Sequence, residues 1–159
     1  MRWLLSALVG TAKAEEGVGV NEIPRRRLFH PQSIAAILAK TIDAEPLTYR
    51  GILMRSTLET DFARVLDRMG AEWIYEPRIY GRKGSGYLPD FQIVREGPAC
   101  YIEVKPTAAE IPLARKRMEV IWRTEPEAVL TVACAEGSVF WVAVKGQPWA
   151  PFSEVWKHA

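Results

Sequence analysis

The sequence predicts an α/β fold in which a mixed sheet is flanked by helices. Three observations lead to this prediction. Apolar residues recur at helical spacing directly after Ser56, and three short runs rich in aromatic and branched residues follow between residues 72 and 104. A second helical segment then precedes an almost continuously apolar run at 128–134, the pattern of a strand buried on both faces.

The first helix has clear start and stop signals. Ser56 and Glu59 form a capping box, and Gly70 ends the segment. Between them, one face of the helix is formed by Leu58, Phe62, Val65, Leu66 and Met69.

The strands after this helix are expected at 72–79, 87–94 and 99–104. A polar turn rich in Gly and Lys at 81–86 joins the first two. The tight turn at 95–98 makes the second and third strands antiparallel neighbours.

The second helix is expected to open after Pro106, with Thr107 as its N-cap and Glu110 three residues later. Its apolar face would be formed by Ala114, Met118, Ile121 and Trp122. Because this helix separates two strands, the strands at 99–104 and 128–134 should run parallel. A further strand is predicted at 139–144.

The chain divides into an N-terminal extension or arm at 1–50, a core at 51–145 and an aromatic tail at 146–159. The extension contains a Gly-rich stretch, the basic run 25–27 and a possible short helix at 31–39. In the tail, Phe152 and Trp156 are four residues apart, which suggests a short closing helix.

Composition excludes several classes of protein. The 159 residues are 48% apolar and 25% charged, which fits one folded domain rather than a disordered chain. The formal net charge of +2 excludes a global basic field for nucleic acid. Cys100 and Cys134 lie in apolar runs, so we expect core fillers rather than a disulfide. Two histidines and no Cys-x-x-Cys argue against structural zinc.

The apolar run 3–9 is too short to span a membrane. It predicts a short N-terminal helix or strand in a cytoplasmic protein. The alternative is a signal peptide cleaved after Ala14.

The residues that carry chemistry are Asp90, at the start of one predicted strand, and Glu103 and Lys105 on the next. Side chains two apart in a strand share a face, and the short turn makes Asp90 a cross-strand neighbour of Glu103. Two carboxylates that close repel each other unless a cation lies between them. Mg²⁺ or Mn²⁺ would suit them, with the backbone carbonyl of Val104 as a further ligand. Lys105 would orient the attacking water or offset developing negative charge.

Pro89-Asp90 followed by Glu103-x-Lys105 resembles the PD-(D/E)xK nuclease superfamily. The resemblance covers about residues 52–145 and implies a restriction-endonuclease-like αβββαβ core. The segments 87–91 and 102–106 are most similar to the TnsA-like transposon endonucleases, as is Tyr75-Glu76-Pro77. The resemblance implies Mg²⁺-dependent DNA cleavage beside a transposase, with Glu59 as a further acidic residue of the site.

Other charged residues are weaker candidates. Arg78, Arg82 and Lys83 on the first hairpin, and Lys116 on the second helix, are candidate DNA contacts, although solvated surface residues would look the same. Glu59 is equally a capping residue, and Glu76 fits an exposed strand position better than a place near the site.

Several functions therefore stay open. The first is an end-cleaving DNA endonuclease that works with a transposase or targeting subunit. A junction resolvase, a repair nuclease or a phage nuclease of the same superfamily is the second, and a non-catalytic nucleic-acid-binding subunit is the third. We find no DNA-recognition motif, so target choice is expected to come from a partner, a homodimer or DNA shape.

Overall fold

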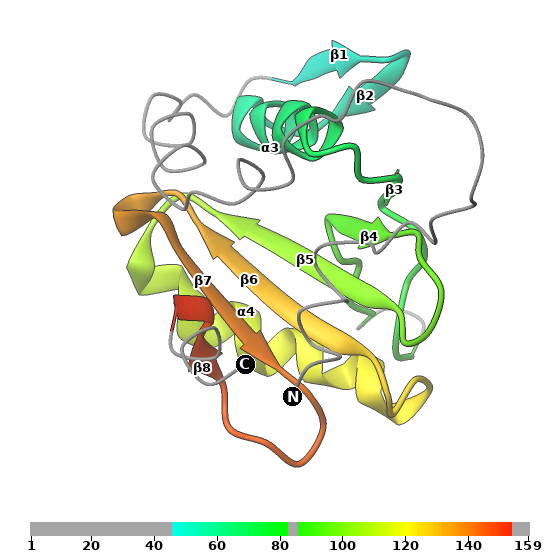
Figure 1. The fold of residues 1–159 in the computed structure, drawn as a ribbon, viewed down its shortest axis with the longest axis vertical. Coiled ribbons are helices and arrows are strands. Elements are labelled where there is room, and N and C mark those ends of the chain that lie inside the picture. The colour runs from blue at the N-terminus through cyan, green and yellow to red at the C-terminus, as the bar shows by residue number, and fades with distance from the viewer. Residues whose placement is uncertain (1–45, 83–85, 154–159) are drawn as a thin grey trace, which may run out of the picture.

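The computed structural model describes residues 46–82 and 86–153, and its centre is a six-stranded mixed sheet between two helices (Figure 1). The strands lie in the order β3-β4-β5-β6-β7-β8. This confirms the predicted α/β class with a mixed sheet flanked by helices. The expected helix at 31–39, the basic run 25–27, Lys83 and Trp156 lie outside the described residues.

Helix α3 (Thr57–Arg68) begins and ends where the sequence predicts. The backbone N–H of Glu59 donates to the Ser56 hydroxyl at 3.2 Å. At the other end, Gly70 adopts a φ of 69°, a conformation that costs glycine little.

Strands β3 (Trp73–Tyr75) and β4 (Phe91–Ile93) are shorter than predicted. The chain leaves β3 at Glu76, whose φ is 46°, and beyond it only Tyr80 and Tyr87 form an isolated bridge. Prolines explain both limits, since Pro77 and Pro89 have no N–H to donate to a ladder.

Strand β5 (Cys100–Lys105) pairs antiparallel with β4 and parallel with β6 (Val129–Cys134), as expected. The crossover consists of η1 (Ala108–Glu110), α4 (Ile111–Met118) and η2 (Glu119–Arg123), so the predicted single helix is a short α-helix between two 3₁₀ turns. The Thr107 prediction was wrong in one respect. Its hydroxyl donates to the Glu110 carboxylate at 3.0 Å instead of capping a backbone N–H.

The sheet continues through η3 (Glu136–Ser138), β7 (Val139–Ala143) and β8 (Ala150–Pro151). The sequence did not predict β8. It also missed the hairpin of β1 (Leu47–Tyr49) and β2 (Ile52–Met54), which lies beside α3 in Figure 1 and spans the predicted boundary at residue 50.

Each face of the sheet has its own core. On one face, α3 packs against Ile102 and Val104, and on the other, α4 packs against Tyr101 and strand β6. Cys100 and Cys134 are buried and free, which confirms their predicted role as core residues. Among the described residues, no helix is long and apolar enough to cross a membrane.

Candidate active site

The register of the sheet sets Asp90 against Glu103. Phe91 pairs with Ile102 at the end of the β4–β5 ladder, so the next position along each strand holds Asp90 on one side and Glu103 on the other. Both side chains are buried, with 3% and 7% of their residue surface exposed. The predicted cross-strand pair is therefore present, and it is far less solvated than a surface pair would be.

Both carboxylate oxygens of Asp90 have partners. Oδ2 accepts a hydrogen bond of 2.7 Å from the backbone N–H of Val104. Oδ1 lies 3.0 Å from Nη2 of Arg55, a residue just before α3. Asp90 thereby ties the start of β4 to both β5 and the segment before α3.

Glu103 is held equally firmly. Oε1 lies 2.7 Å from Nζ of Lys105, and Oε2 accepts a hydrogen bond from the Tyr87 hydroxyl. Alternation along β5 explains the Lys105 contact, since residues two apart share a face. The residues between and before them, Val104 and Ile102, face the α3 core.

The Val104 carbonyl is oriented toward the same edge of β5. In a strand, the N–H and C=O of one residue point to the same neighbour, and the Val104 N–H points to Asp90. Continuing the β4–β5 register would put Val104 opposite Pro89, which has no N–H. The Val104 carbonyl thus has no ladder donor from β4, in accord with its predicted use as a metal ligand.

Glu59 lies beside this pair and also serves the helix start. Its Oε2 accepts from the backbone N–H of Arg55 at 3.0 Å and from the Tyr75 hydroxyl at 2.6 Å. The capping box is thus modified, because the carboxylate reaches the residue before Ser56 instead of Ser56 itself. Glu59 is close enough to Asp90 to raise its pKa.

The electrostatics are those of a crowded acidic site. Burial, and then the charge of Glu103, raise the pKa of Asp90 to about 8. Burial lowers the pKa of Lys105, but the charge and hydrogen bond of Glu103, together with the charges of Asp90 and Glu110, outweigh burial and leave that pKa above its ordinary value. Lys105 is therefore an ammonium at neutral pH.

The side chains of these residues provide only part of the ligand set that a hard divalent cation requires. Within 46–82 and 86–153, no group of three His, Cys, Asp or Glu side chains is arranged to hold a metal ion. Asp90 and Glu103 provide two carboxylates, and Val104 provides a carbonyl. Mg²⁺ commonly takes one or two carboxylates and completes its shell with waters and substrate phosphates, so this donor set is adequate.

The predicted DNA contacts do not gather at this site. Arg78 forms an ion pair with Glu125, and its guanidinium lies 4.6 Å from the centre of the Tyr80 ring. Arg82 and Lys116 are exposed side chains.

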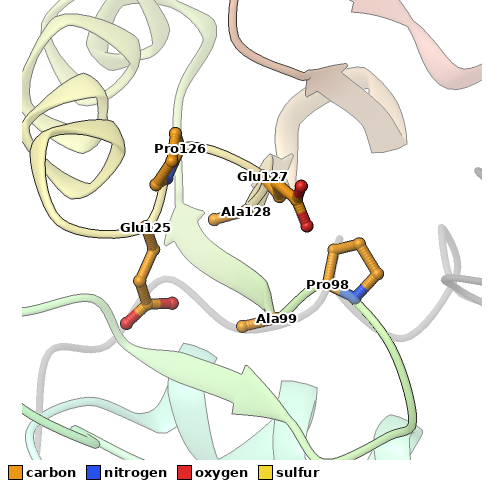
Figure 2. Close-up of a pocket in the computed structure, with 6 residues that line it drawn as sticks. All are labelled: Pro98, Ala99, Glu125, Pro126, Glu127 and Ala128. Carbon is orange, nitrogen blue, oxygen red and sulfur yellow. The ribbon is translucent and has the colours of Figure 1, made fainter.

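Glu125 lines a hollow of about 310 Å³ at the start of β5 and β6 (Figure 2). The hollow is bordered by Pro98, Ala99, Glu125, Pro126, Glu127 and Ala128. Through its ion pair with Glu125, Arg78 is therefore held near the start of β5, whereas Lys105 lies at the other end of that strand.

Sequence reasoning missed four residues around the carboxylates. Arg55, Tyr75 and Tyr87 were not assigned to the site, and Glu76 was interpreted as an exposed strand residue. That interpretation was wrong, since Glu76 lies outside β3 and its Oε1 is 2.6 Å from Nε of Arg55. Tyr87 gave a usable signal because it lies in the same short segment as Asp90, and Tyr75 and Glu76 lie in another segment that the family resemblance includes.

Comparisons of this chain with protein-family models, with curated proteins and with solved structures find no match.

Proposed function

We propose that this chain is a metal-dependent endonuclease that hydrolyses phosphodiester bonds in DNA. The observation that supports this most is the facing pair of buried carboxylates, Asp90 and Glu103, with Lys105 2.7 Å from Glu103. A protein gains no stability from burying two acids side by side. The pair is understandable as a site that binds a cation during function.

The order of elements gives independent support. One helix, three strands, a helix and a parallel strand follow one another as α3, β3, β4, β5, α4 and β6. This order agrees with the αβββαβ core of the PD-(D/E)xK nucleases. Asp90 directly precedes β4 and Glu103 lies on the adjoining β5, an arrangement that supports the resemblance to that motif.

The residues have distinct roles in the proposed reaction. Asp90, Glu103 and the Val104 carbonyl would hold Mg²⁺ or Mn²⁺, and Glu59 would support them. When bound, the metal polarises a phosphodiester oxygen and lowers the pKa of a water. Lys105 keeps its proton at neutral pH, so it donates to a phosphate oxygen and offsets the negative charge that develops there. Tyr87 fixes the orientation of Glu103.

We further infer that the chain is the end-cleaving subunit of a transposition system and that a transposase partner selects the target. The net charge of +2 is small for a protein that finds DNA alone, and Arg78 is paired with Glu125. This part of the proposal rests on the similarity of segments 87–91 and 102–106 to TnsA-like endonucleases.

Cleavage of DNA tests the proposal. Purified protein should nick or cut supercoiled plasmid, linear duplex or a four-way junction in the presence of Mg²⁺ and not in EDTA. Asp90→Ala and Lys105→Ala should each remove that activity, with Glu96→Ala at an exposed turn position as a surface control. Activity that survives both site substitutions would contradict the assignment. Preference for the four-way junction would instead favour a junction resolvase.

A further inference from the structure

Arg55 has a position among the site residues that no sequence pattern assigned to it. It precedes the N-cap of α3, and its guanidinium extends to two acids on other elements. Nη2 lies 3.0 Å from Oδ1 of Asp90, and Nε lies 2.6 Å from Oε1 of Glu76. Its backbone N–H donates to Glu59. One residue thus contacts three of the four acids of the site.

The number of charges makes this position consequential. Four carboxylates, from Glu59, Glu76, Asp90 and Glu103, and two cationic side chains, from Arg55 and Lys105, make the direct polar contacts of the site. Lys105 is occupied by Glu103. Arg55 is the cation in contact with Asp90, whose ionised form is disfavoured by burial and by the charge of Glu103.

The Arg55 guanidinium contacts two acids at once, and its contact with Glu76 has poor geometry. Glu76 adopts a φ of 46°, a left-handed conformation that is unusual for a residue other than glycine. Its Oε1 is buried and makes no hydrogen bond although Nε of Arg55 is only 2.6 Å away, so this ion pair is poorly aligned. Because the Arg55 side chain is also half exposed, its guanidinium can change orientation at little cost in free energy.

We propose that Arg55 is a positioning residue that holds Oδ1 of Asp90 in the metal-free protein and competes with the divalent cation for that oxygen. A cation bound to Asp90 must take over the oxygen that Nη2 now contacts. Glu76 then remains as the acidic partner of the guanidinium, which re-orients toward it and stays beside the site. The inference rests on the proposed function, because it assumes that Asp90 is a metal ligand.

The test measures Mn²⁺ binding by isothermal titration calorimetry at pH 8.5, a pH that limits competition from protons. Arg55→Gln should bind Mn²⁺ about tenfold more tightly than the wild type, because the competing charge is gone. Arg55→Lys keeps one positive charge but cannot bridge Asp90 and Glu76, so its affinity should be intermediate. Thermal unfolding of each variant checks that it is folded.

Arg50→Gln is the matched control. Arg50 lies in the turn of the β1–β2 hairpin and forms an ion pair of the same length, 3.0 Å, with Asp67. Its loss should leave Mn²⁺ affinity at the wild-type value. If Arg55→Gln binds no more tightly than Arg50→Gln while the wild type binds Mn²⁺, the competition is refuted and the metal site stands. If none of the folded proteins binds Mn²⁺, both proposals are overturned.

Discussion

Two clusters of tyrosine, carboxylate and cation lie along the same strand, β5, and they differ in charge balance. At its start, Glu125 accepts hydrogen bonds from Tyr80 and Tyr101 and pairs with Arg78. At its end, Tyr87 and Lys105 contact Glu103, which faces a second buried acid. The first cluster has one carboxylate and one cationic side chain, whereas the second has four carboxylates and two cationic side chains in direct contact.

This difference separates a structural network from a candidate site. A single carboxylate with two hydroxyl donors and a guanidinium is fully satisfied, and such a network rigidifies the fold. Facing carboxylates with too few cations lower the stability of the fold. Their arrangement becomes favourable only when a further cation binds between them. Similar residue types therefore have different meanings at the two ends of β5.

The largest effect that this comparison predicts is on cleavage. Glu103→Gln keeps an oxygen for Lys105 and a group that Tyr87 can contact, but it removes the charge that binds metal. We expect cleavage of plasmid in Mg²⁺ to fall by roughly 10²- to 10³-fold, the scale of losing one preorganised electrostatic group. Glu125→Gln is the matched change at the other cluster and should leave the cleavage rate close to the wild-type rate. Equal losses in both variants would refute the distinction between the clusters.

The second prediction concerns stability. Tyr101 is buried and donates to Oε2 of Glu125 at 2.8 Å. Tyr101→Phe removes a hydrogen bond to a charged group, so urea denaturation should show a loss of about 1.5–3 kcal/mol in the free energy of unfolding. Mn²⁺ affinity should not change, because Glu103 and Asp90 keep their partners. A large change in affinity would mean that the two clusters are coupled.

The third prediction is a pH dependence of the metal-free protein. Burial, and then the charge of Glu103, raise the pKa of Asp90 from its ordinary value of 3.8 to about 8 in the folded protein, so between these values the folded state binds more protons than the unfolded state. The free energy of unfolding should therefore fall as pH rises from about 4 to about 8. Asp90→Asn, measured in EDTA by urea denaturation, should flatten this slope. A slope unchanged by the substitution would contradict the shifted pKa.

Much of the fold followed from periodicity and turn chemistry. The apolar stripe of α3, the buried run of β6 and the tight turn before β5 each have one physical interpretation, and all three were confirmed. The hairpin β1–β2 and strand β8 were missed, since segments of two or three residues carry too little pattern to identify. The ends of β3 and β4 were misplaced because Pro77 and Pro89 cannot donate to the ladder and because the chain turns at Glu76, where no glycine signals a left-handed residue.

The site was predictable where it depends on register and not where it depends on long side chains. The pairing of Asp90 with Glu103, and the contact of Glu103 with Lys105, follow from strand geometry alone. Arg55 reaches Asp90 across 35 positions of sequence, and no spacing rule gives the direction of a flexible side chain. Arg78 has a charge that suits DNA, but Glu125 was near in space and remote in sequence.

Binding of Mn²⁺ to Glu103→Gln and to Glu125→Gln, compared by isothermal titration calorimetry, tests the central claim most directly. The claim is that the facing carboxylates at the end of β5 hold a divalent cation. It predicts one Mn²⁺ per chain for Glu125→Gln, with the affinity of the wild type, and no measurable binding for Glu103→Gln. Undiminished binding by Glu103→Gln would contradict it, because the ion would then lie elsewhere.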